Sequence, residues 1–524
     1  AGGVHFSPAS IMFSPINCHA FCVFATSIRQ NGFNVQRFAL AIHQLIKRRE
    51  KMTAKMQTVL EKQRAAFTAA MPESMAVRRD RIDRAIAMLI DHAEDFAKAV
   101  SADFGHRSHE QTLLTDIMPS VSAMKHAKKH FESWAKGEKR KPTFPLGLLG
   151  SKAEIVYQPK GVVGVVAPWN FPVGMVMVPM AGILAAGNRA MIKPSEFTER
   201  VSALFEEVVP KYFAEEEMAV FTGDAEVGMA FSKLAFDHMI FTGATGVGRH
   251  IMRAAADNLV PVTLELGGKS PTIVGRSADK KKAGERIALG KMMNAGQICL
   301  APDYLLVASD QEDDIIEAVK AGVTAQYPTL LHNDDYTSVV NGRNYERLQS
   351  YLDDAREKGA ELIEINPAGE DFESSNGNKM PLTIVRKVTD DMKVMQEEIF
   401  GPILPVMTYS SMDEAIDYVN AHDRPLGLYY FGSDKAEEER VLTRTVSGGV
   451  TINDVVFHNA MEDLPFGGVG PSGMGNYHGA DGFKTFSHMR AVYRQTGVDV
   501  AGIGGFKAPY GKATLKTLAK ELKK

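Results

Sequence analysis

Cys299 is the first candidate for chemistry in this sequence. It follows a helix-like run (Ala283–Met293) and a glycine turn, within the string Asn294–Pro302. A free cysteine is usually an inert buried residue, and a nucleophilic one needs a base or a positive field that supplies the thiolate. No sequence neighbour provides either, so a catalytic role requires a partner from elsewhere in the chain.

A second candidate is Glu265, which lies between two leucines at the end of an expected strand, before the pair Gly267-Gly268. One interpretation is a surface carboxylate, alone or paired with Lys269. The other is a partly desolvated carboxyl group with a raised pKa, which suits a general base. The residues alone leave the two interpretations equally open.

Three further motifs carry groups that suit cofactor binding or substrate polarisation. Gly243–Gly248 follows a strand and opens a helix, where backbone N–H groups can approach a pyrophosphate, although its spacing is not the usual GxGxxG. Lys193 and Glu196, just past a strand, could contact a ribose or phosphate, or form a surface ion pair. Asn170, between two prolines in Pro168–Pro172, is a fixed amide that could stabilise an oxyanion.

The elements that must position these residues alternate between helices and strands. A helical period of apolar residues extends from Thr53 to about Ser133. After it, apolar β-branched strings alternate with helical patterns; the strings are Gly161–Ala167, Asn188–Ile192, Met218–Phe221 and His238–Phe241. This alternation predicts βαβ units with a mostly parallel sheet, and a second α/β stretch follows from about Pro271 to Asp454.

Length and composition exclude several classes of protein. The 524 residues, at about 150 per domain, have the mass of three or four domains. Apolar residues make up 45% and charged residues 23%, which excludes collagen-like, coiled-coil and disordered chains. The net charge of −3 gives no basic field for nucleic acid. The uncharged run Gly161–Asn188 holds three prolines, so we expect a buried strand, turn and helix rather than a membrane span.

The cysteines and the N-terminal residues bear on where the protein works. Three cysteines (Cys18, Cys22, Cys299) are too few for a disulfide framework and favour a reducing compartment, so we expect a cytoplasmic protein. Residues 1–51 have no acid before Glu50, and their basic residues follow the apolar stretch, unlike a signal peptide. We expect residues 1–51 to be a disordered leader outside the fold.

Taken in order, seven motifs resemble the aldehyde dehydrogenase superfamily from about Thr53 to Lys512. They are Pro168–Pro172, Lys193–Glu196, Phe241–Gly243, Leu264–Lys269, Gly296–Cys299, Glu397–Pro402 and Pro465–Gly468. Ala301–Tyr304 and Leu464–Gly479 resemble the class 3-like branch, and within it the bacterial coniferyl aldehyde dehydrogenases. One motif could arise by chance, but seven in the family order could hardly do so.

The resemblance implies an α/β fold with a Rossmann-like cofactor domain, an α/β catalytic domain and a small bridging segment for oligomerisation. The implied ranges are 52–141 with 161–264 for the NAD(P)-binding domain, 265–455 for the catalytic domain, 142–160 with 476–500 for the bridging segment, and 501–524 for the tail.

It also implies roles for individual residues. Cys299 is expected to attack an aldehyde and form a thiohemiacetal and then a thioester, Asn170 to hold the oxyanion, and Glu265 to activate the hydrolytic water. The implied cofactor is NAD, with NADP possible, and no metal is implied. The expected cofactor-binding residues are Trp169, Lys193, Glu196, Gly243, Ala244, Thr245, Gly246, Val247, Gly248, Glu398 and Phe400.

Departures and rival functions remain open. Ala244 and Gly246 replace the Ser and Glu of many relatives, so the turn depends on backbone donors, while Glu196 disfavours a 2′-phosphate. We expect oxidation of an aromatic or cinnamyl aldehyde; the alternatives are an aliphatic aldehyde dehydrogenase, a CoA-acylating enzyme and a non-catalytic binding protein. CoA-acylating relatives typically lack the base at position 265. The expected partners are a small aldehyde and a second copy in a homodimer, without nucleic acid or stable membrane insertion.

Overall fold

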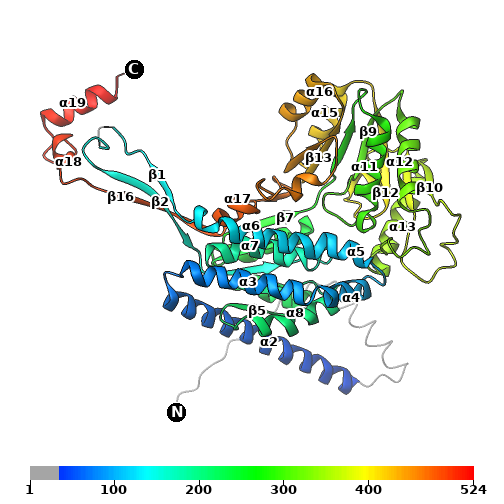
Figure 1. Ribbon diagram of the computed structural model, residues 1–524, viewed down its shortest axis with the longest axis horizontal. Helices are drawn as coiled ribbons and strands as arrows, with labels where there is room; N and C mark the ends of the chain where they lie inside the picture. Colours follow the sequence, from blue (N-terminus) through cyan, green and yellow to red (C-terminus); the bar gives the residue numbers. More distant parts are fainter. Residues whose placement is uncertain (1–34, 145, 524) are drawn as a thin grey trace, which may run out of the picture. The chain divides into compact units, whose positions relative to one another are not determined.

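The computed structural model describes residues 35–144 and 146–523 (Figure 1). The chain divides into two units, residues 1–56 and 57–524. In the first unit the described part is the beginning of helix α2 (Val35–Ala70). Residues 35–51 belong to this helix, and no glycine or proline interrupts the stretch. The expectation that residues 1–51 form a leader outside the fold stays a prediction. The rest of the predicted leader, residues 1–34, lies outside the described residues.

A six-stranded sheet carries the first half of the candidate site. Its order is β5-β4-β3-β6-β7-β15, parallel except for β15, which pairs antiparallel with β7. The bounds are β3 (Val162–Val166), β4 (Arg189–Lys193), β5 (Met218–Val220), β6 (His238–Gly243), β7 (Val262–Leu266) and β15 (Gly473–Met474). The strand order reverses between β3 and β6, so their carboxyl ends open a crevice where α/β proteins bind ligands. The predicted Rossmann-like arrangement is confirmed.

Helices connect these parallel strands and precede them. The crossovers are α7 (Gly174–Ala186), α8 (Glu199–Tyr212), α9 (Ala225–Ser232) and α10 (Thr245–Ala256). The preceding helices are α3 (Met75–Asp91), α4 (Ala93–Asp103), α5 (His109–Thr112), a π-helical turn η1 (Leu113–Ile117) and α6 (Met118–Trp134). Apolar faces of α3, α4, α6, α7 and α8 share one buried core with β3 and β4. The uncharged run Gly161–Asn188 is thus a strand, a loop and a helix, as expected, and no described helix is long and apolar enough to cross a membrane.

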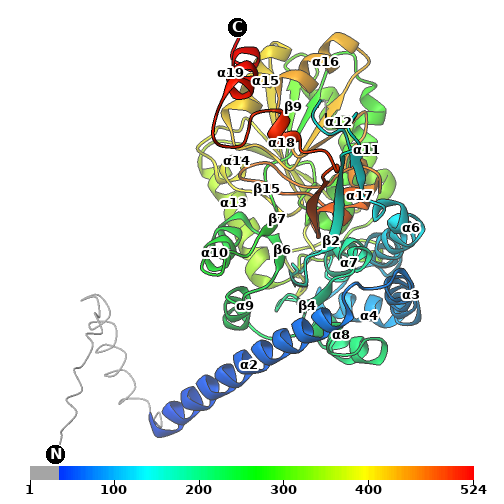
Figure 2. The same cartoon turned by 90° about the vertical axis from the view of Figure 1, so that its left-hand side faces the viewer.

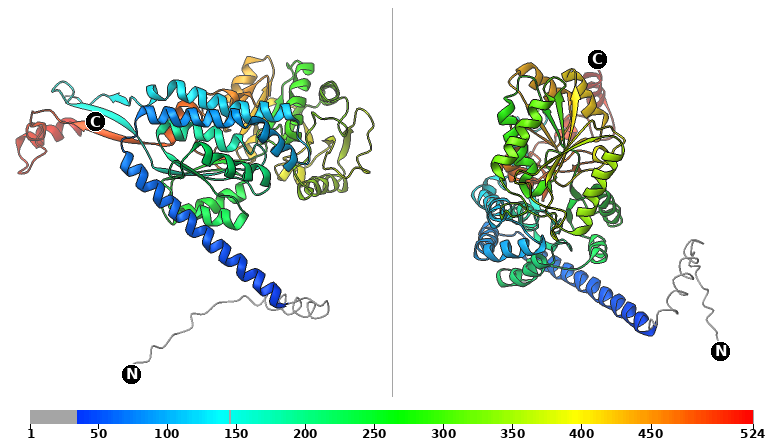
Figure 3. Two further views of the ribbon diagram at one scale, coloured as in Figure 1. Left: turned by 60° about the horizontal axis from the view of Figure 1, so that its bottom comes forward. Right: turned by 90° about the vertical axis from the view of Figure 1, so that its right-hand side faces the viewer.

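A seven-stranded sheet carries the second half. Its order is β10-β11-β12-β9-β8-β13-β14, parallel except for β10. The strands are β8 (Pro271–Val274), β9 (Tyr304–Ala308), β10 (Glu361–Ile365), β11 (Leu382–Arg386), β12 (Ile403–Tyr409), β13 (Gly427–Phe431) and β14 (Gly449–Ile452). Their hydrophobic residues alternate between two cores, one on each face, and Figure 3 (right) shows helices on both sides.

The helices of this part are assigned to the two faces by those cores. On one face lie α11 (Lys280–Met292) and α12 (Glu312–Gln326); on the other lie α13 (Gly342–Glu357), α14 (Lys393–Gln396), α15 (Met412–Ala421) and α16 (Lys435–Arg444). A short 3₁₀ segment, η2 (Met293–Gly296), follows α11 and leads to Cys299. The α/β stretch predicted from Pro271 to Asp454 is therefore confirmed.

A third, three-stranded sheet has the order β1-β2-β16 and is antiparallel. It is built from β1 (Glu138–Arg140), β2 (Lys152–Pro159) and β16 (Ser487–Arg494), and β2 and β16 run side by side in Figures 1 and 2. The remaining elements are η3 (Phe457–Ala460), α17 (Gly479–Thr485), α18 (Val500–Ile503) and α19 (Lys512–Glu521). The sequence-based domain boundaries stay a prediction.

Candidate active site

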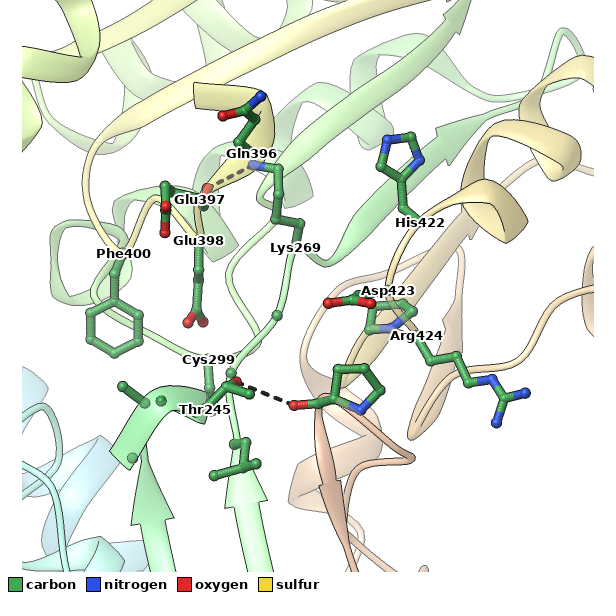
Figure 4. Close-up of a pocket in the computed structure, with 18 of the residues that line it drawn as sticks. Thr245, Lys269, Cys299, Gln396, Glu397, Glu398, Phe400, His422, Asp423 and Arg424 are labelled. Carbon is green, nitrogen blue, oxygen red and sulfur yellow. Dashed lines mark hydrogen bonds between the residues drawn. The ribbon is translucent and has the colours of Figure 1, made fainter. Parts of the chain in front are cut away.

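One cavity of about 850 Å³ brings most of the candidate residues together. It lies where loops at the carboxyl ends of β3, β6 and β7 meet loops of the seven-stranded part, and Figure 4 shows its lining. The predicted site residues that line it are Trp169, Asn170, Gly243, Ala244, Thr245, Gly246, Glu265, Cys299, Glu398 and Phe400. Two separate halves of the chain therefore contribute to one site.

The nucleophile candidate follows a strained turn. After α11, Asn294, Ala295 and Gly296 all have left-handed φ values of 50°, 51° and 73°. Two consecutive non-glycine residues in this region are costly and persist only when the surroundings hold them. The turn presents Cys299, the one free cysteine in the described part of the chain, half-buried at the cavity wall.

Buried amides hold that turn. The Gln297 side chain donates from Nε2 to the Asn294 carbonyl (2.9 Å) and the Ser338 carbonyl (3.0 Å), and its Oε1 accepts from Val340 N (2.9 Å). Asn170 Nδ2 donates to the Gln297 carbonyl (3.1 Å), and the Asn170 residue is 3% exposed. Because an amide carries two N–H groups, one remains for a group in the cavity that Asn170 lines.

Glu265 lies on β7, between Thr242 of β6 and Gly473 of β15. It is 1% exposed, and its Oε1 has no hydrogen-bond partner among the described residues. Burial raises the pKa of Glu265 to about 8, although hydrogen bonding to Cys299 opposes the shift. Burial and the nearby carboxylates of Glu265 and Glu398 raise the pKa of the Cys299 thiol well above its ordinary value. The interpretation of Glu265 as a surface carboxylate is therefore wrong.

Glu398 enters the cavity from the loop after α14, and Figure 4 shows its carboxyl group pointing toward Cys299. Burial and the charge of Asp303 raise the pKa of Glu398 to about 8. Its Oε1 is buried and has no hydrogen-bond partner within the described ranges. A Cβ on Gly267 would approach the Glu398 carboxyl group far more closely than the 3.0 Å that real Cβ atoms keep. The missing side chain at Gly267 therefore makes room for this carboxyl group.

An ion pair between Lys269 and Asp303 holds the loop that carries Glu398. Lys269 Nζ pairs with Asp303 Oδ2 and donates to the carbonyls of Val394 (2.6 Å) and Glu397 (3.0 Å). The other oxygen, Asp303 Oδ1, accepts from Ile399 N (3.0 Å). The Lys269 side chain therefore binds this loop. It does not pair with Glu265, so the alternative interpretation of the motif as a Glu265–Lys269 pair is wrong.

Aromatic rings and a helix start complete the cavity. Phe400 meets Trp169 edge to face, with ring centroids 5.3 Å apart. Helix α10 begins at Thr245, directly after β6, so its first N–H groups have no acceptor within the helix and suit an anion. Thr245 Oγ1 donates to the Pro471 carbonyl (3.2 Å). The cavity therefore suits a long ligand with both flat and anionic parts. The Trp169 indole and the Phe400 ring can contact a flat part, and the start of α10 can bind an anionic one.

Comparison with known sequences and structures decides the family. The model of the "Aldehyde dehydrogenase family" matches residues 41–492. The chain belongs to the aldehyde dehydrogenase family. It is 56% identical over 472 residues to a "Probable coniferyl aldehyde dehydrogenase" of Caulobacter vibrioides, covering 90% of this chain and 97% of the relative. It is 53% identical over 456 residues to the "Coniferyl aldehyde dehydrogenase" of a Pseudomonas strain, covering 87% and 94%.

A solved structure agrees with the family. A substrate-bound structure of Staphylococcus aureus AldH superposes with a TM-score of 0.82 at 35% identity, covering 88% of this chain and 99% of that one. The chain is therefore an aldehyde dehydrogenase, an oxidoreductase that uses a nicotinamide cofactor, and the resemblance and fold class predicted from the sequence are confirmed.

Four predicted cofactor residues do not line the cavity of this aldehyde dehydrogenase: Lys193, Glu196, Val247 and Gly248. Lys193 ends β4, is 2% exposed, and places its Nζ 2.8 Å from the Pro194 carbonyl and 3.6 Å from Glu196 Oε2. This pair lies at the same sheet edge as the crevice, one strand from β3. Its expected contact with the cofactor stays a prediction.

Sequence reasoning missed several supporting residues. Gln297 and Asp303 lie inside quoted motifs, and the available signal was two polar residues close to Cys299 in the sequence; the structure buries both. Arg107 and Asp116 form a fully buried ion pair near Asn170, and no local motif marks them. Among the described residues, no three His, Cys, Asp or Glu side chains are grouped to hold a metal ion.

Proposed function

We propose that this aldehyde dehydrogenase oxidises aromatic or cinnamyl-type aldehydes such as coniferaldehyde to the carboxylic acid. One observation carries the chemistry: the Cys299 thiol and the buried, otherwise unpaired Glu265 carboxyl group share one wall of the cavity. A nucleophile beside a carboxyl base is the minimal arrangement for acylating and then hydrolysing a thiol. The printed names of the relatives at 53% and 56% identity support the substrate class.

The first half-reaction belongs to Cys299 and Asn170. The Cys299 thiolate attacks the aldehyde carbon, and the C=O π electrons move to oxygen, which gives the oxyanion of a thiohemiacetal. The free N–H of Asn170 and the backbone N–H of Cys299 donate to that oxygen as negative charge develops on it. Loss of the aldehyde hydrogen as hydride then leaves a thioester on Cys299.

The second half-reaction belongs to Glu265. Its carboxylate takes a proton from water, the hydroxide attacks the thioester carbon, and the acid leaves as the C–S bond breaks. A carboxylate with a pKa of about 8 is a stronger base than an exposed one, which suits this step near neutral pH. The CoA-acylating alternative has no use for a base at this place, so Glu265 favours release of the free acid.

The residues present fit a nicotinamide cofactor. The unpartnered Glu398 Oε1 and the space left by Gly267 suit a ribose diol, and the first turn of α10 suits a pyrophosphate. When bound, the nicotinamide accepts the hydride, and its positive charge favours the Cys299 thiolate. Phe400 and Trp169 line the adjacent wall of the cavity. Lys193 and Glu196 are proposed to contact the adenosine ribose.

Product analysis tests this proposal. Coniferaldehyde, benzaldehyde and hexanal are incubated with the enzyme and NAD, with and without CoA, and NADH and organic products are quantified. We expect free acid with or without CoA, and a higher kcat/KM for coniferaldehyde than for hexanal. Acyl-CoA as the product would favour the CoA-acylating reading, and a preference for hexanal would favour the aliphatic one.

Cofactor preference, assembly and compartment are parts of the same proposal. Glu196 disfavours a 2′-phosphate, so we propose NAD in preference to NADP, measured as kcat/KM for each. The three-stranded sheet and the tail are proposed to join two copies into a homodimer, measured by light scattering. The scarcity of cysteine supports a reducing, cytoplasmic setting.

A further inference from the structure

Arg107 is buried as completely as a core leucine, although it is charged. Its residue is 1% exposed, and its guanidinium pairs with Asp116, Nη2 to Oδ2 at 2.9 Å, with neither side chain exposed. Nη1 donates to the main-chain carbonyl of Asn170 (2.8 Å), and Nη2 donates to Thr115 Oγ1 (2.8 Å). The guanidinium therefore holds the residue whose side-chain amide is proposed to bind the oxyanion.

Asp116 fixes the other side of the same loop. Its Oδ1 accepts from the backbone N–H groups of Val173 (3.1 Å) and Gly174 (2.8 Å), where α7 begins. Asp116 lies in the π-helical turn η1, and such turns are frequent at functional sites. The ion pair thus spans the loop between β3 and α7, with Arg107 on the Asn170 carbonyl and Asp116 on the helix start.

The segment 107–117 also reaches the turn that presents Cys299. Gln111 Oε1 accepts from Asn294 N (3.1 Å) and from Thr337 Oγ1 (2.8 Å). Asn294 Nδ2 in turn donates to the carbonyls of Asn170 (3.1 Å) and Gln297 (3.2 Å). One buried hydrogen-bond network therefore joins segment 107–117 to the turn before Cys299 and to the loop that carries Asn170.

Stability alone does not account for this pair. Two charges lose their hydration when buried, and well-packed apolar residues of similar volume often replace such a pair without loss of stability. The Arg107–Asp116 pair does what apolar residues cannot, because it fixes three main-chain groups at defined positions. A lysine could not reproduce it, since one ammonium lacks the planar fork that spans Asp116 and the Asn170 carbonyl.

We propose that Arg107 is a positioning residue for the oxyanion site, acting through the main chain of Asn170. Held between Arg107, Asn294 and Gln297, the Asn170 amide keeps one N–H directed at the carbonyl oxygen of the substrate. This inference rests on the proposed function, which assigns the oxyanion to Asn170. It predicts that loss of Arg107 slows acylation of Cys299 and leaves cofactor binding unchanged.

The test compares two buried arginines by single-turnover kinetics. Arg107→Met removes the guanidinium, Arg107→Lys keeps only the charge, and Arg81→Met is the matched control. Arg81 has a 4% exposed side chain paired with Glu73 (3.0 Å) and Glu217 (2.9 Å), and it does not line the cavity. We measure the rate of the first NADH formed, the Kd of NAD and Tm.

Arg107→Met and Arg107→Lys are expected to lower the rate of the first NADH by about 10- to 100-fold, somewhat less than removal of an oxyanion donor itself. The Kd of NAD should change less than about twofold, because no cofactor group is lost. Arg81→Met should lower Tm without lowering that rate. If Arg107→Met does not fold because Asp116 is left unpaired, the pair of changes Arg107→Met and Asp116→Asn replaces it and carries the same expectation.

A double-mutant cycle with Asn170→Ala separates this inference from the proposed function. If Arg107 acts through Asn170, Arg107→Met should lower the rate of the first NADH less than about threefold further in the Asn170→Ala background. The same loss in both backgrounds, or no loss in either, would overturn the positioning role. An unchanged rate in Asn170→Ala alone would instead refute the oxyanion role, and the inference with it.

Discussion

The space left by Gly267 gives a quantitative prediction for cofactor binding. An alanine there places its Cβ against the Glu398 carboxyl group, well inside the 3.0 Å limit. The carboxyl group must retreat by about 1 Å, which takes a hydrogen bond of about 2.8 Å beyond bonding range. A bond to a charged group contributes about 1.5–3 kcal/mol, so Gly267→Ala should raise the Kd of NAD roughly 10- to 100-fold.

The neighbouring glycine supplies the control. A Cβ on Gly268 would meet its nearest atom, Pro425 Cα, at 3.5 Å, an ordinary contact, so Gly268→Ala should bind NAD nearly normally. Trp169 lines the cavity, so NAD titration can be followed by tryptophan fluorescence at a pH of about 9, above the Glu398 pKa. An unchanged Kd in Gly267→Ala, or an equal loss in both variants, would refute the assignment of Glu398 to the ribose.

Three further predictions follow from the Cys299 side of the cavity. Burial raises the pKa of Glu265 to about 8, and the protonated carboxyl group cannot act as a base. We therefore expect kcat to rise with pH and to level off above about pH 8. A flat profile of kcat from about pH 6 to 9 would contradict this. Cys299 is the only cysteine from Met52 to Lys524, so one equivalent of iodoacetamide should fully inactivate a chain beginning at Met52. Because the pKa of its thiol is raised, the reaction should be slow at neutral pH and about tenfold faster per pH unit; a pH-independent rate would count against it. Gly296→Ala puts a Cβ against the Gly401 carbonyl at a φ of 73°, so it should destabilise the protein by at least about 1–2 kcal/mol in urea unfolding; unchanged stability would show that the turn is not constrained.

The strands, the crevice and the cavity-lining candidates were predictable because their signals are local. Apolar strings mark β3, β4, β5 and β6 of the Rossmann-like sheet, and the glycine turn that follows β6 marks the crevice. The burial of Glu265 was not readable in this way. It depends on β15, whose Gly473 pairs with Glu265 from more than 200 positions further along the chain.

The supporting network was invisible for the same physical reason. Arg107 lies 63 positions from Asn170, and Gln111 lies 183 positions from Asn294, so no periodicity or spacing links them. The composition of residues 1–51 likewise did not predict that α2 begins at Val35, although no glycine or proline interrupts residues 35–51. Composition describes a segment as a whole, whereas helix formation depends on its individual residues.

The division of labour between Cys299 and Glu265 is the central claim, and a burst experiment tests it most directly. Enzyme at known active-site concentration is mixed with NAD and excess coniferaldehyde, and NADH is followed from the first turnover. Glu265→Gln should release a burst of one NADH per active site and then turn over slowly, because its thioester lacks a base for water. Cys299→Ala should give no burst. A burst from Cys299→Ala, or a steady-state rate in Glu265→Gln equal to that of the unmodified enzyme, would contradict the account.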